Sequence, residues 1–378
     1  MAKMTETKSD VLIVGGGPVG LYLGCLLAQK GIECCILERR TERSLHSRSI
    51  GIHPPALRSL EKIGLAESVS SKAVVIENGL VFDGPTFLGK LSFSDCPPPF
   101  QHVLSIPQFE TEALLVARFN ELAPGRLHTG VFAKTIEQES NGVALTTEDD
   151  QVFRAQYVAI CDGARSGLRT QLGIPVGSGD YPVSYLMGDF ADTTTFASDA
   201  AIFLSKDGVV ESFPLPDGQR RWVVLTDSVN ESSQMLCDTI RSRTGHEIDH
   251  ETCSMTSLFS PSHVLVETMH QGRVLLAGDA AHVVSPIGGQ GMNLGWLDAV
   301  EAAQAMAGAL ERPESQEALF RGYSKSRRNA ARSARRRAEF NMWMGLAGLL
   351  HGIKRVAART ILRRPLSTYF ARMFTMQT

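Results

Sequence analysis

The 378-residue chain lacks the marks of several protein classes. Its net charge is only −2 at pH 7, from 38 basic and 40 acidic side chains, so no excess of positive charge indicates nucleic-acid binding. Its seven cysteines are odd in number and include no C-x-x-C pair, which argues against a disulfide framework and a structural zinc site. We therefore expect reduced thiols in a cytoplasmic protein, with no metal and no nucleic-acid partner.

The sequence also lacks a segment with the pattern of a membrane span or signal peptide. No residue between Asp10 and Lys30 is charged, but glycines at positions 15, 16, 17 and 20, together with Pro18, would break a helix there. Residues 340–353 are uncharged too, yet they are too short to cross a bilayer. What is present is an ordinary globular composition, 43% hydrophobic and 21% charged, in a chain long enough for two to three domains.

A glycine-rich turn lies near the N-terminus. The pattern predicts a buried strand over residues 11–14, a helix over 21–30 and a second buried strand over 32–37. Between the first strand and the helix, three glycines stand in G-x-G-x-x-G register: Gly15, Gly17 and Gly20. In this setting the helix N-terminus typically binds the pyrophosphate of a dinucleotide.

Each residue of the turn has a mechanical role. Gly15 permits the tight turn, Gly17 lets the backbone approach a pyrophosphate, and Gly20 lets the helix pack on the strand. Glu38, at the end of the second strand, can accept hydrogen bonds from ribose hydroxyls. The alternative is a glycine-rich turn without a ligand. No second G-x-G-x-x-G follows a predicted strand, which disfavours an enzyme with separate flavin and nicotinamide domains.

Two further segments follow predicted strands. A strand over residues 157–161 leads into the run D-G-A-R-S-G-L-R, which begins at Asp162. A strand over residues 273–277 leads into G-D-A-A-H, which contains Asp279, and then into P-I-G-G-Q-G-M-N-L-G, which begins at Pro286. Together with the first turn, these segments resemble the single-component flavoprotein aromatic hydroxylases, whose type member is p-hydroxybenzoate hydroxylase, over residues 10–337.

The resemblance implies a set of FAD-binding residues. They are Gly15, Gly17, Pro18, Val19, Gly20, Glu38, Arg39, Arg48, Gln108, Asp162, Asp279, Pro286, Gly288, Gly291, Met292 and Asn293. In the family, an aspartate that matches Asp279 hydrogen-bonds the ribityl chain. Backbone N–H groups of residues 291–293 would face flavin N1 and the C2 carbonyl, where a helix N-terminus stabilises the charge of reduced flavin.

For some of these residues, a purely structural role without a ligand is an alternative. Arg48 also fits a surface arginine, Gln108 an exposed turn residue, and Asp162 a cap of the next helix. A base for the substrate is harder to assign. Candidates by chemistry are His53, His102, Tyr185 and His263, and each also fits a structural or surface residue.

The resemblance also implies an organisation and an activity. We expect an α/β fold with a Rossmann-like FAD-binding domain (residues 1–75, 104–180 and 266–340). An α+β substrate domain with a mostly antiparallel sheet (76–103 and 181–265) is inserted into it. The activity would be that of a monooxygenase that consumes NADPH or NADH and O2. Through a flavin C4a-hydroperoxide it would insert one oxygen atom into a phenolic or polyketide-type aromatic substrate.

Other functions remain open on the same fold. They are an epoxidase or Baeyer–Villiger oxygenase, a halogenase, an FAD-dependent reductase and, in another class, a redox-silent FAD-binding partner protein. The tryptophan-halogenase signature W-x-W-x-I-P is absent, which disfavours the halogenase.

The last part of the sequence is strongly basic. Residues 321–378 contain fourteen lysines and arginines and one acid, Glu339. Apolar residues recur at helical spacing over 340–353. We expect basic C-terminal helices over 341–378, with their apolar face on the FAD domain. The alternative is an amphipathic helix that contacts an anionic membrane or a lipid-like substrate.

Overall fold

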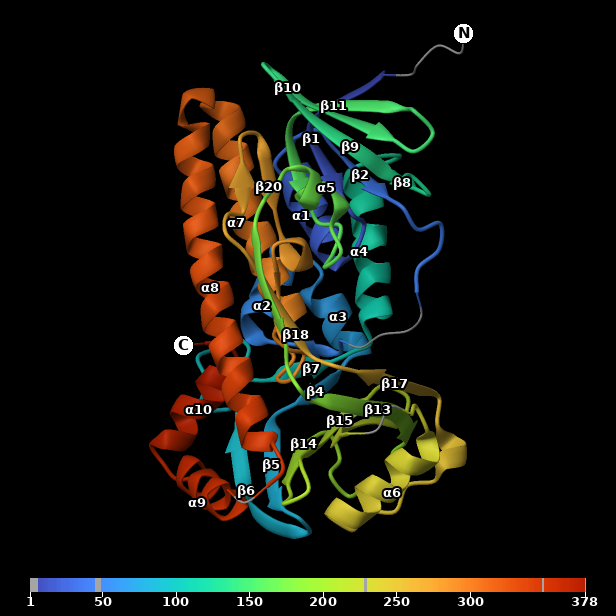
Figure 1. The fold of residues 1–378 in the computed structure, drawn as a ribbon, viewed down its shortest axis with the longest axis vertical. Helices are drawn as coiled ribbons and strands as arrows, with labels where there is room; N and C mark the ends of the chain where they lie inside the picture. Colours follow the sequence, from blue (N-terminus) through green and yellow to red (C-terminus); the bar gives the residue numbers. More distant parts are fainter. Residues whose placement is uncertain (1–5, 45–48, 228–229, 349, 378) are drawn as a thin grey trace.

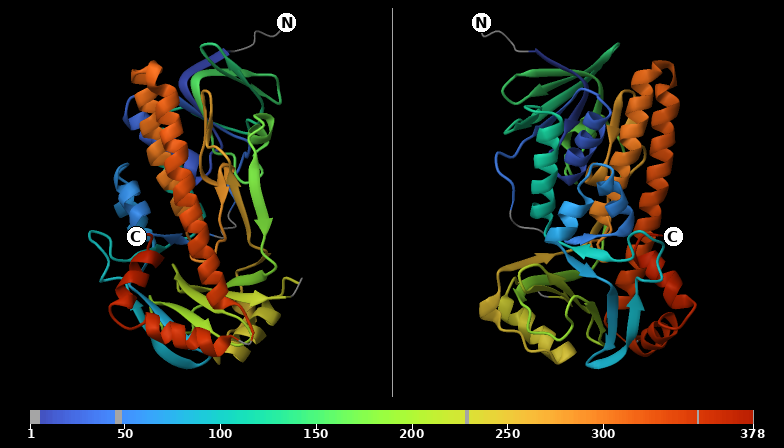
Figure 2. Two further views of the ribbon diagram at one scale, coloured as in Figure 1. Left: turned by 60° about the vertical axis from the view of Figure 1, so that its left-hand side comes forward. Right: turned by 180° about the vertical axis from the view of Figure 1, so that it is seen from behind.

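The computed structural model describes residues 6–44, 49–227, 230–348 and 350–377. The molecule is elongated, with one large sheet and its helices at one end and a second sheet at the other (Figure 1). The long helix α8 runs between the two ends in every view (Figure 2). Within the described ranges, no helix combines the length and the hydropathy needed to cross a membrane.

The larger sheet, here called the main sheet, has parallel strands at its centre. Its order is β19-β20-β11-β1-β2-β8, and β10 and β9 extend it from β11. The bounds are β1 Glu6–Val14, β2 Cys34–Glu38, β8 Leu127–Thr129, β9 Ala133–Glu139, β10 Gly142–Thr147, β11 Val152–Ile160, β19 His270–Gln271 and β20 Val274–Leu276. The predicted strands at 11–14, 32–37, 157–161 and 273–277 are all present.

The register of the main sheet brings the sequence motifs together. Val14 pairs with Leu37 on one side and with Ile160 on the other, and Ile160 pairs with Leu276. The parallel strands β1, β2, β11 and β20 therefore end at the same edge. The segments that follow them start side by side at this edge, which is where open α/β sheets bind ligands.

Helices cover the main sheet. Helix α1 (Pro18–Gln29) packs between α4 (Gln108–Leu122) and α7 (Gly291–Glu311), and α7 packs against α8 (Gln316–Gly345). The shorter helices are α2 (Pro54–Glu61), α3 (Ala66–Lys72) and α5 (Gly167–Gln171). The strands β1 and β2 and the inner face of α1 belong to one continuous buried cluster, which fixes the position of the turn between them.

The second sheet is mostly antiparallel, with the order β17-β13-β16-β15-β14-β5-β6. Its strands are β5 Asn78–Asp83, β6 Thr86–Ser92, β13 Ser184–Ala191, β14 Ala200–Leu204, β15 Val210–Leu215, β16 Gln219–Thr226 and β17 Met255–Phe259. Helix α6 (Ser233–Thr244) covers one face. The predicted fold class, a Rossmann-like domain with an inserted, mostly antiparallel α+β part, is confirmed.

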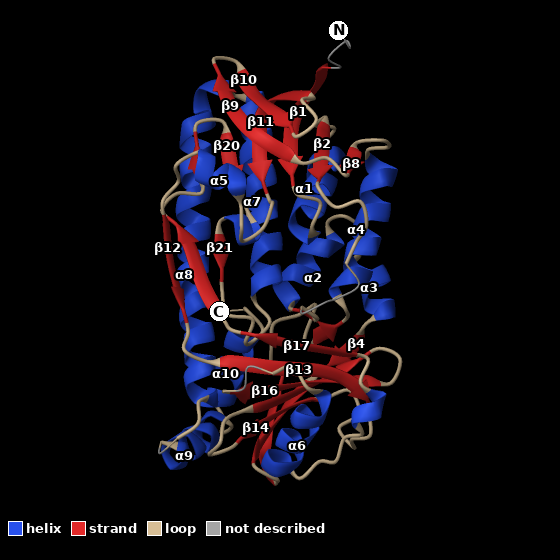
Figure 3. Cartoon of the chain, turned by 45° about the vertical axis from the view of Figure 1, so that its right-hand side comes forward, coloured by secondary structure: helices blue, strands red, loops and turns tan. Residues whose placement is uncertain are grey.

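Two three-stranded sheets connect the ends of the molecule (Figure 3). One contains β12 (Val176–Asp180), β18 (Ser262–Val266) and β21 (His282–Val283). The other contains β3 (Gly51–Ile52), β7 (Val103–Ser105) and β4 (Val74–Ile76). The assignment of residues 76–103 and 181–265 to a substrate domain remains a proposal.

The C-terminal helices differ from the expectation in their packing. Helix α8 ends at Gly345, and α9 (His351–Ile361) and α10 (Leu366–Phe374) follow as separate helices. Both pack on β6 of the second sheet, and the ring of Phe374 on α10 also lies beside that of His53, in a segment expected to belong to the FAD domain. Gly348, at a φ of +119°, lies in the break, where other residues rarely adopt this conformation.

Candidate functional site

A cavity of about 830 Å³ extends from the carboxyl edge of the main sheet to the second sheet. Gly17 and Glu38 line one end, and Glu211 and Val223 line the other. Its size is in the range of small-molecule and cofactor sites.

The glycine turn lies at the main-sheet end. A Cβ on Gly20 would come within 1.9 Å of the Gly15 carbonyl oxygen, so Gly20 keeps α1 close to the turn. Gly15, at a φ of +107°, packs against Cys161, where a Cβ would lie 2.3 Å from the carbonyl oxygen. A Cβ on Gly17, in contrast, would meet no atom within 4 Å. Gly15 and Gly20 are therefore closely packed, while Gly17 faces open space at the helix N-terminus.

Glu38 closes the turn. Its carboxylate accepts hydrogen bonds from the backbone N–H of Gly16 (2.6 Å) and from the backbone (2.8 Å) and side chain (2.9 Å) of Arg40. Burial alone would raise the pKa of Glu38, but these hydrogen bonds outweigh it and the pKa is lowered. The ionised carboxylate lines the cavity, while Arg40, which the sequence analysis did not select, orients it.

Asp162 lies beside the turn, at the end of β11. Its Oδ1 is buried and has no hydrogen-bond partner among the described residues, and burial raises its pKa. The helix-cap interpretation of Asp162 is wrong, because Ser166 caps α5 and accepts from the Arg169 backbone N–H (3.1 Å). The Arg169 guanidinium donates to the Ala280 carbonyl oxygen (2.9 Å), which ties this segment to the next motif.

Asp279 follows β20, and its side chain is accessible at the cavity. The side chain lines the cavity and is surrounded by protein, and this burial raises the pKa of its carboxyl. Behind it, buried Asp298 accepts from His282 Nε2 (2.5 Å), Arg327 Nε (2.7 Å) and the Gly278 backbone N–H (3.0 Å). This cluster, not found from the sequence, fixes the backbone on both sides of Asp279.

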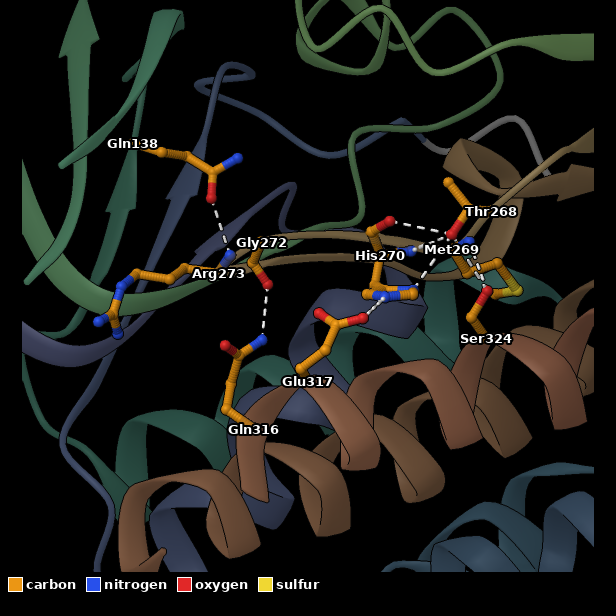
Figure 4. A network of polar contacts seen from close by, with 9 residues as sticks. All are labelled: Gln138, Thr268, Met269, His270, Gly272, Arg273, Gln316, Glu317 and Ser324. Atoms are coloured by element: carbon orange, nitrogen blue, oxygen red, sulfur yellow. Dashed lines mark hydrogen bonds and ion pairs between the residues drawn. The ribbon is translucent and has the colours of Figure 1, made fainter. Parts of the chain in front are cut away.

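The hairpin before Asp279 is anchored at a distance (Figure 4). The backbone N–H of Arg273 donates to Gln138 on β9 (2.8 Å), and Gln316 on α8 donates to the Gly272 carbonyl oxygen (2.7 Å). Ser324 accepts from the Met269 backbone N–H (2.9 Å). These contacts connect β19 and β20 to a strand and a helix on either side, and so position the strand that ends at Asp279.

The late glycine loop forms the middle of the cavity. Pro286, Gly288, Gly291 and Met292 line it, and α7 begins at Gly291. The first-turn N–H groups of a helix have no partner within the helix and favour negative charge. Asn293 contributes differently: its side chain donates to the carbonyl oxygens of Gly51 (2.9 Å) and Gly289 (2.7 Å), and so supports the loop from behind.

The structure brings most of the predicted binding residues to one cavity. Those that line it are Gly15, Gly17, Pro18, Val19, Glu38, Arg39, Gln108, Asp162, Asp279, Pro286, Gly288, Gly291 and Met292. Gly20 and Asn293 support the lining, and Arg48 lies outside the described residues.

These residues fit FAD. A single cavity is lined by Gly17, with open space at its Cβ position, by Asp162, whose Oδ1 has no partner among the described residues, and by Gly291 at a helix N-terminus. Glu38 and Asp279 bring carboxylates to the same cavity, and carboxylates accept hydrogen bonds from hydroxyl groups such as those of FAD. Their roles as FAD ligands remain proposals.

Of the four candidate bases, His53 alone lines the cavity. Burial lowers the pKa of His53 to about 4, so the ring is neutral at pH 7 and is a weak base. Tyr185 is fully buried behind the wall, and burial raises its pKa well above the ordinary value. His102 and His263 do not line the cavity. Among the described residues, no cluster of three or more His, Cys, Asp or Glu side chains is suited to hold a metal.

The second-sheet end of the cavity is largely apolar. Its lining includes Val81, Met187, Ile202, Phe213, Val223 and Phe259. Two charged side chains interrupt this wall. Arg221 forms two hydrogen bonds with Asp189 (2.6 and 2.7 Å), and Glu211 stands apart from them. The sequence analysis selected neither residue, and the local pattern carries little signal for them: Ser212 follows Glu211 in its strand, and Gln219 and Arg220 precede Arg221 in its strand.

The C-terminal helix α10 completes the wall. Phe374 lines the cavity, with its ring centroid 6.4 Å from that of His53 and 6.3 Å from that of Phe93. The basic composition of this segment did not predict that one of its residues lines the cavity.

Comparisons with known proteins agree with this geometry. The family model described as FAD binding domain matches residues 8–338. Rifampicin monooxygenase from Streptomyces venezuelae is 30% identical over 80% of this chain and 64% of its own length. Pentachlorophenol 4-monooxygenase from Sphingobium chlorophenolicum is 30% identical over 85% of this chain and 62% of its own length. The chain thus spans less than two thirds of these curated relatives.

Solved structures share the fold over nearly the whole chain. p-Nitrophenol 4-monooxygenase from Pseudomonas putida aligns with a TM-score of 0.89 at 20% identity and covers 99% of both chains. Anhydrotetracycline hydroxylase from Streptomyces rimosus aligns with a TM-score of 0.81 at 26% identity over 98% of this chain and 76% of that one. The chain therefore belongs to the FAD-binding domain family that includes these flavin-dependent aromatic monooxygenases, as the three sequence motifs predicted.

Proposed function

We propose that the protein is an FAD-dependent monooxygenase that inserts one oxygen atom of O2 into an aromatic substrate. NADPH or NADH supplies the electrons, and the second oxygen atom leaves as water. The named functions of the relatives support this proposal, since they include monooxygenases of phenolic and polyketide-type compounds.

One observation carries the proposal: a single cavity connects the dinucleotide turn to an apolar wall. A cofactor with its phosphates at Gly17 and its ring near Gly288 and Met292 would meet a substrate on the wall formed by the second sheet. Bound FAD supplies the redox and oxygen-transfer chemistry, and the protein supplies position, charge and dryness.

The residues of the chain have distinct parts in this function. Glu38, Asp162 and Asp279 are proposed to bind the ADP and ribityl portions, and the first turn of α7 is proposed to stabilise negative charge on the flavin ring. Phe213, Phe259 and Phe374 exclude water from the space beside it. Exclusion of water matters because solvent in such a site promotes loss of reducing equivalents as hydrogen peroxide.

The test is substrate-dependent NAD(P)H oxidation by the FAD-loaded protein. A panel of phenols and polyketide aromatics is screened, and the product is examined by mass spectrometry. We expect a gain of one oxygen atom. A product that gains hydrogen or chlorine instead would indicate a reductase or a halogenase.

A redox-silent role is the competing proposal from another class. A Diels-Alderase of pyrroindomycin biosynthesis has this fold, with a TM-score of 0.81 at 25% identity. NAD(P)H consumption separates the two, because an aromatic that is altered with no NAD(P)H oxidised and no oxygen gained would favour the redox-silent role.

We also propose that α9 contacts an anionic membrane surface. Ile353 and Val356 are each 61% exposed, and Arg359 and Arg363, which follow at spacings of three and four residues, are exposed too. An exposed apolar pair flanked by arginines is complementary to a bilayer of acidic lipids.

A further inference from the structure

Glu211 is a carboxyl group placed among apolar side chains. It lies on β15, is 8% exposed and lines the cavity. Its cross-strand neighbours are Ile202 on β14 and Val223 on β16, and Phe213 follows on the same face of its own strand. Among the described residues it has no hydrogen-bond or ion-pair partner. A buried carboxyl without a partner costs free energy, which suggests that its partner is a ligand.

The charged groups near Glu211 do not neutralise it. Arg221 forms hydrogen bonds with Asp189 on β13, and the buried hydroxyl of Tyr185 has no hydrogen-bond partner in the part of the chain that the structure describes. Strands β14, β4 and β7, which also contact β15, contain no ionisable side chain, and α6 packs against β15 on the other face of the sheet. Burial therefore raises the pKa of Glu211 to about 7.

We propose that Glu211 receives the phenolic hydroxyl of the aromatic substrate and takes up its proton. The hydroxyl O–H bond breaks, an O–H bond forms on the carboxylate, and the negative charge passes to the phenolate oxygen. An electron-rich phenolate is the more reactive form for attack by an electrophilic oxygen. This inference rests on the proposed monooxygenase function and assigns to Glu211 the binding and deprotonation of its substrate.

The surroundings of Glu211 support a phenol. The apolar side chains beside it offer contact to an aromatic ring, and a single acceptor among them fixes one polar group on that ring. A carboxyl whose pKa lies near neutral pH is suited to accept a proton and release it later. His53, the histidine of the same cavity, is much less basic.

The test measures binding of para-cresol, a phenol that keeps its hydroxyl proton at pH 8, and of its methyl ether, para-methylanisole, to the FAD-loaded protein by calorimetry without NAD(P)H. At about pH 8 we expect the wild type to prefer the phenol by roughly tenfold or more, since a hydrogen bond to a charged group is worth about 1.5–3 kcal/mol. In Glu211→Gln this preference falls to near one. Glu314→Gln, on an exposed residue far along the chain, is the matched control.

A stability measurement separates a ligand-binding role from a structural one. The raised pKa means that the ligand-free wild type loses stability as pH rises from the ordinary carboxyl value of 4.5 to about 7. Glu211→Gln should therefore melt at a higher temperature than the wild type at about pH 8, while it loses the preference for the phenol. Glu211→Leu should likewise melt at a higher temperature than the wild type and lose the preference for the phenol.

Several results would contradict the proposed role of Glu211. It is wrong if the wild type binds neither probe, binds the ether as tightly as the phenol, or shares its preference with Glu211→Gln. It is also wrong if both variants melt lower than the wild type. None of these results bears on the proposed monooxygenase function, which the NAD(P)H oxidation and product mass of the wild type test separately.

Discussion

At the residue scale, two glycines of one turn should respond in opposite ways to the same added methyl group. Gly17→Ala adds a Cβ where no protein atom lies within 4 Å, at an ordinary φ of −77°. We expect the fold to persist and FAD affinity to fall about tenfold or more, because the methyl occupies the approach to the pyrophosphate. Flavin fluorescence titration measures this change.

Gly20→Ala is the matched variant. Its Cβ would lie 1.9 Å from the Gly15 carbonyl oxygen, so the helix must move away from the strand. We expect a loss of about 1–3 kcal/mol in unfolding free energy. Should Gly17→Ala lose stability but keep FAD affinity, the assignment of open space at Gly17 to the phosphates would be contradicted.

The buried cluster behind Asp279 predicts a pH-dependent stability. Burial alone would raise the pKa of Asp298, but His282 and Arg327 outweigh it and lower the pKa. For His282, burial would lower the pKa and Asp298 raises it by more. The stabilisation from Asp298 is thus lost as pH falls through its depressed pKa. That from His282 is lost as pH rises through its elevated pKa.

Asp298→Asn tests this cluster. We expect a loss of about 3 kcal/mol in unfolding free energy near neutral pH, because the buried His282 and Arg327 lose a shared carboxylate and Arg327 keeps only its ion pair with Glu301 (2.9 Å). Urea denaturation across pH should show the deficit shrinking toward both extremes. The exposed Asp238→Asn is the control, and a deficit that stays constant with pH would contradict the assignment.

At the element scale, the strand–turn–helix units could be predicted from the sequence. The cavity wall at the second-sheet end, which distant segments form together, could not. Buried parallel strands appear in sequence as continuous apolar runs, so the strands that end at Val14 and Glu38 could be placed from local pattern alone. Glu211 and Phe374 reach the cavity through sheet pairing and helix packing between distant segments. No local pattern contains that information.

Helix α10 is expected to keep water out of the cavity. Phe374→Ala opens the wall beside His53 and Phe93, and we expect a larger share of NAD(P)H oxidation to end as hydrogen peroxide. A peroxide assay against product yield measures this share. Leu366→Ala, on an exposed residue of the same helix, should leave it unchanged, and an equal effect of both variants would contradict a specific role for Phe374.

Helix α9 gives a separate prediction about partners. Ile353→Ser combined with Val356→Ser removes the exposed apolar pair without changing charge. We expect the wild type to sediment with vesicles of phosphatidylserine more than with vesicles of phosphatidylcholine, and the double variant to lose most of this binding. Equal sedimentation of wild type and variant would show that the pair does not contact lipid.

At the scale of the whole molecule, two sheets made from interleaved segments share one cavity. The main sheet brings Glu38 and Asp279 to one end, and the second sheet brings Glu211 to the other. The connecting strands and α8 link these ends, so the distance between cofactor and substrate would be set by the fold as a whole (Figure 3).

Isotopically labelled dioxygen tests this account most directly. The FAD-loaded protein is supplied with NAD(P)H, a phenol that accelerates its oxidation, and labelled O2 in unlabelled water. The account predicts that the product carries one labelled oxygen atom, and that Gly17→Ala and Glu211→Gln reduce its yield. An oxygen atom derived from water, or a product with no added oxygen, would contradict it.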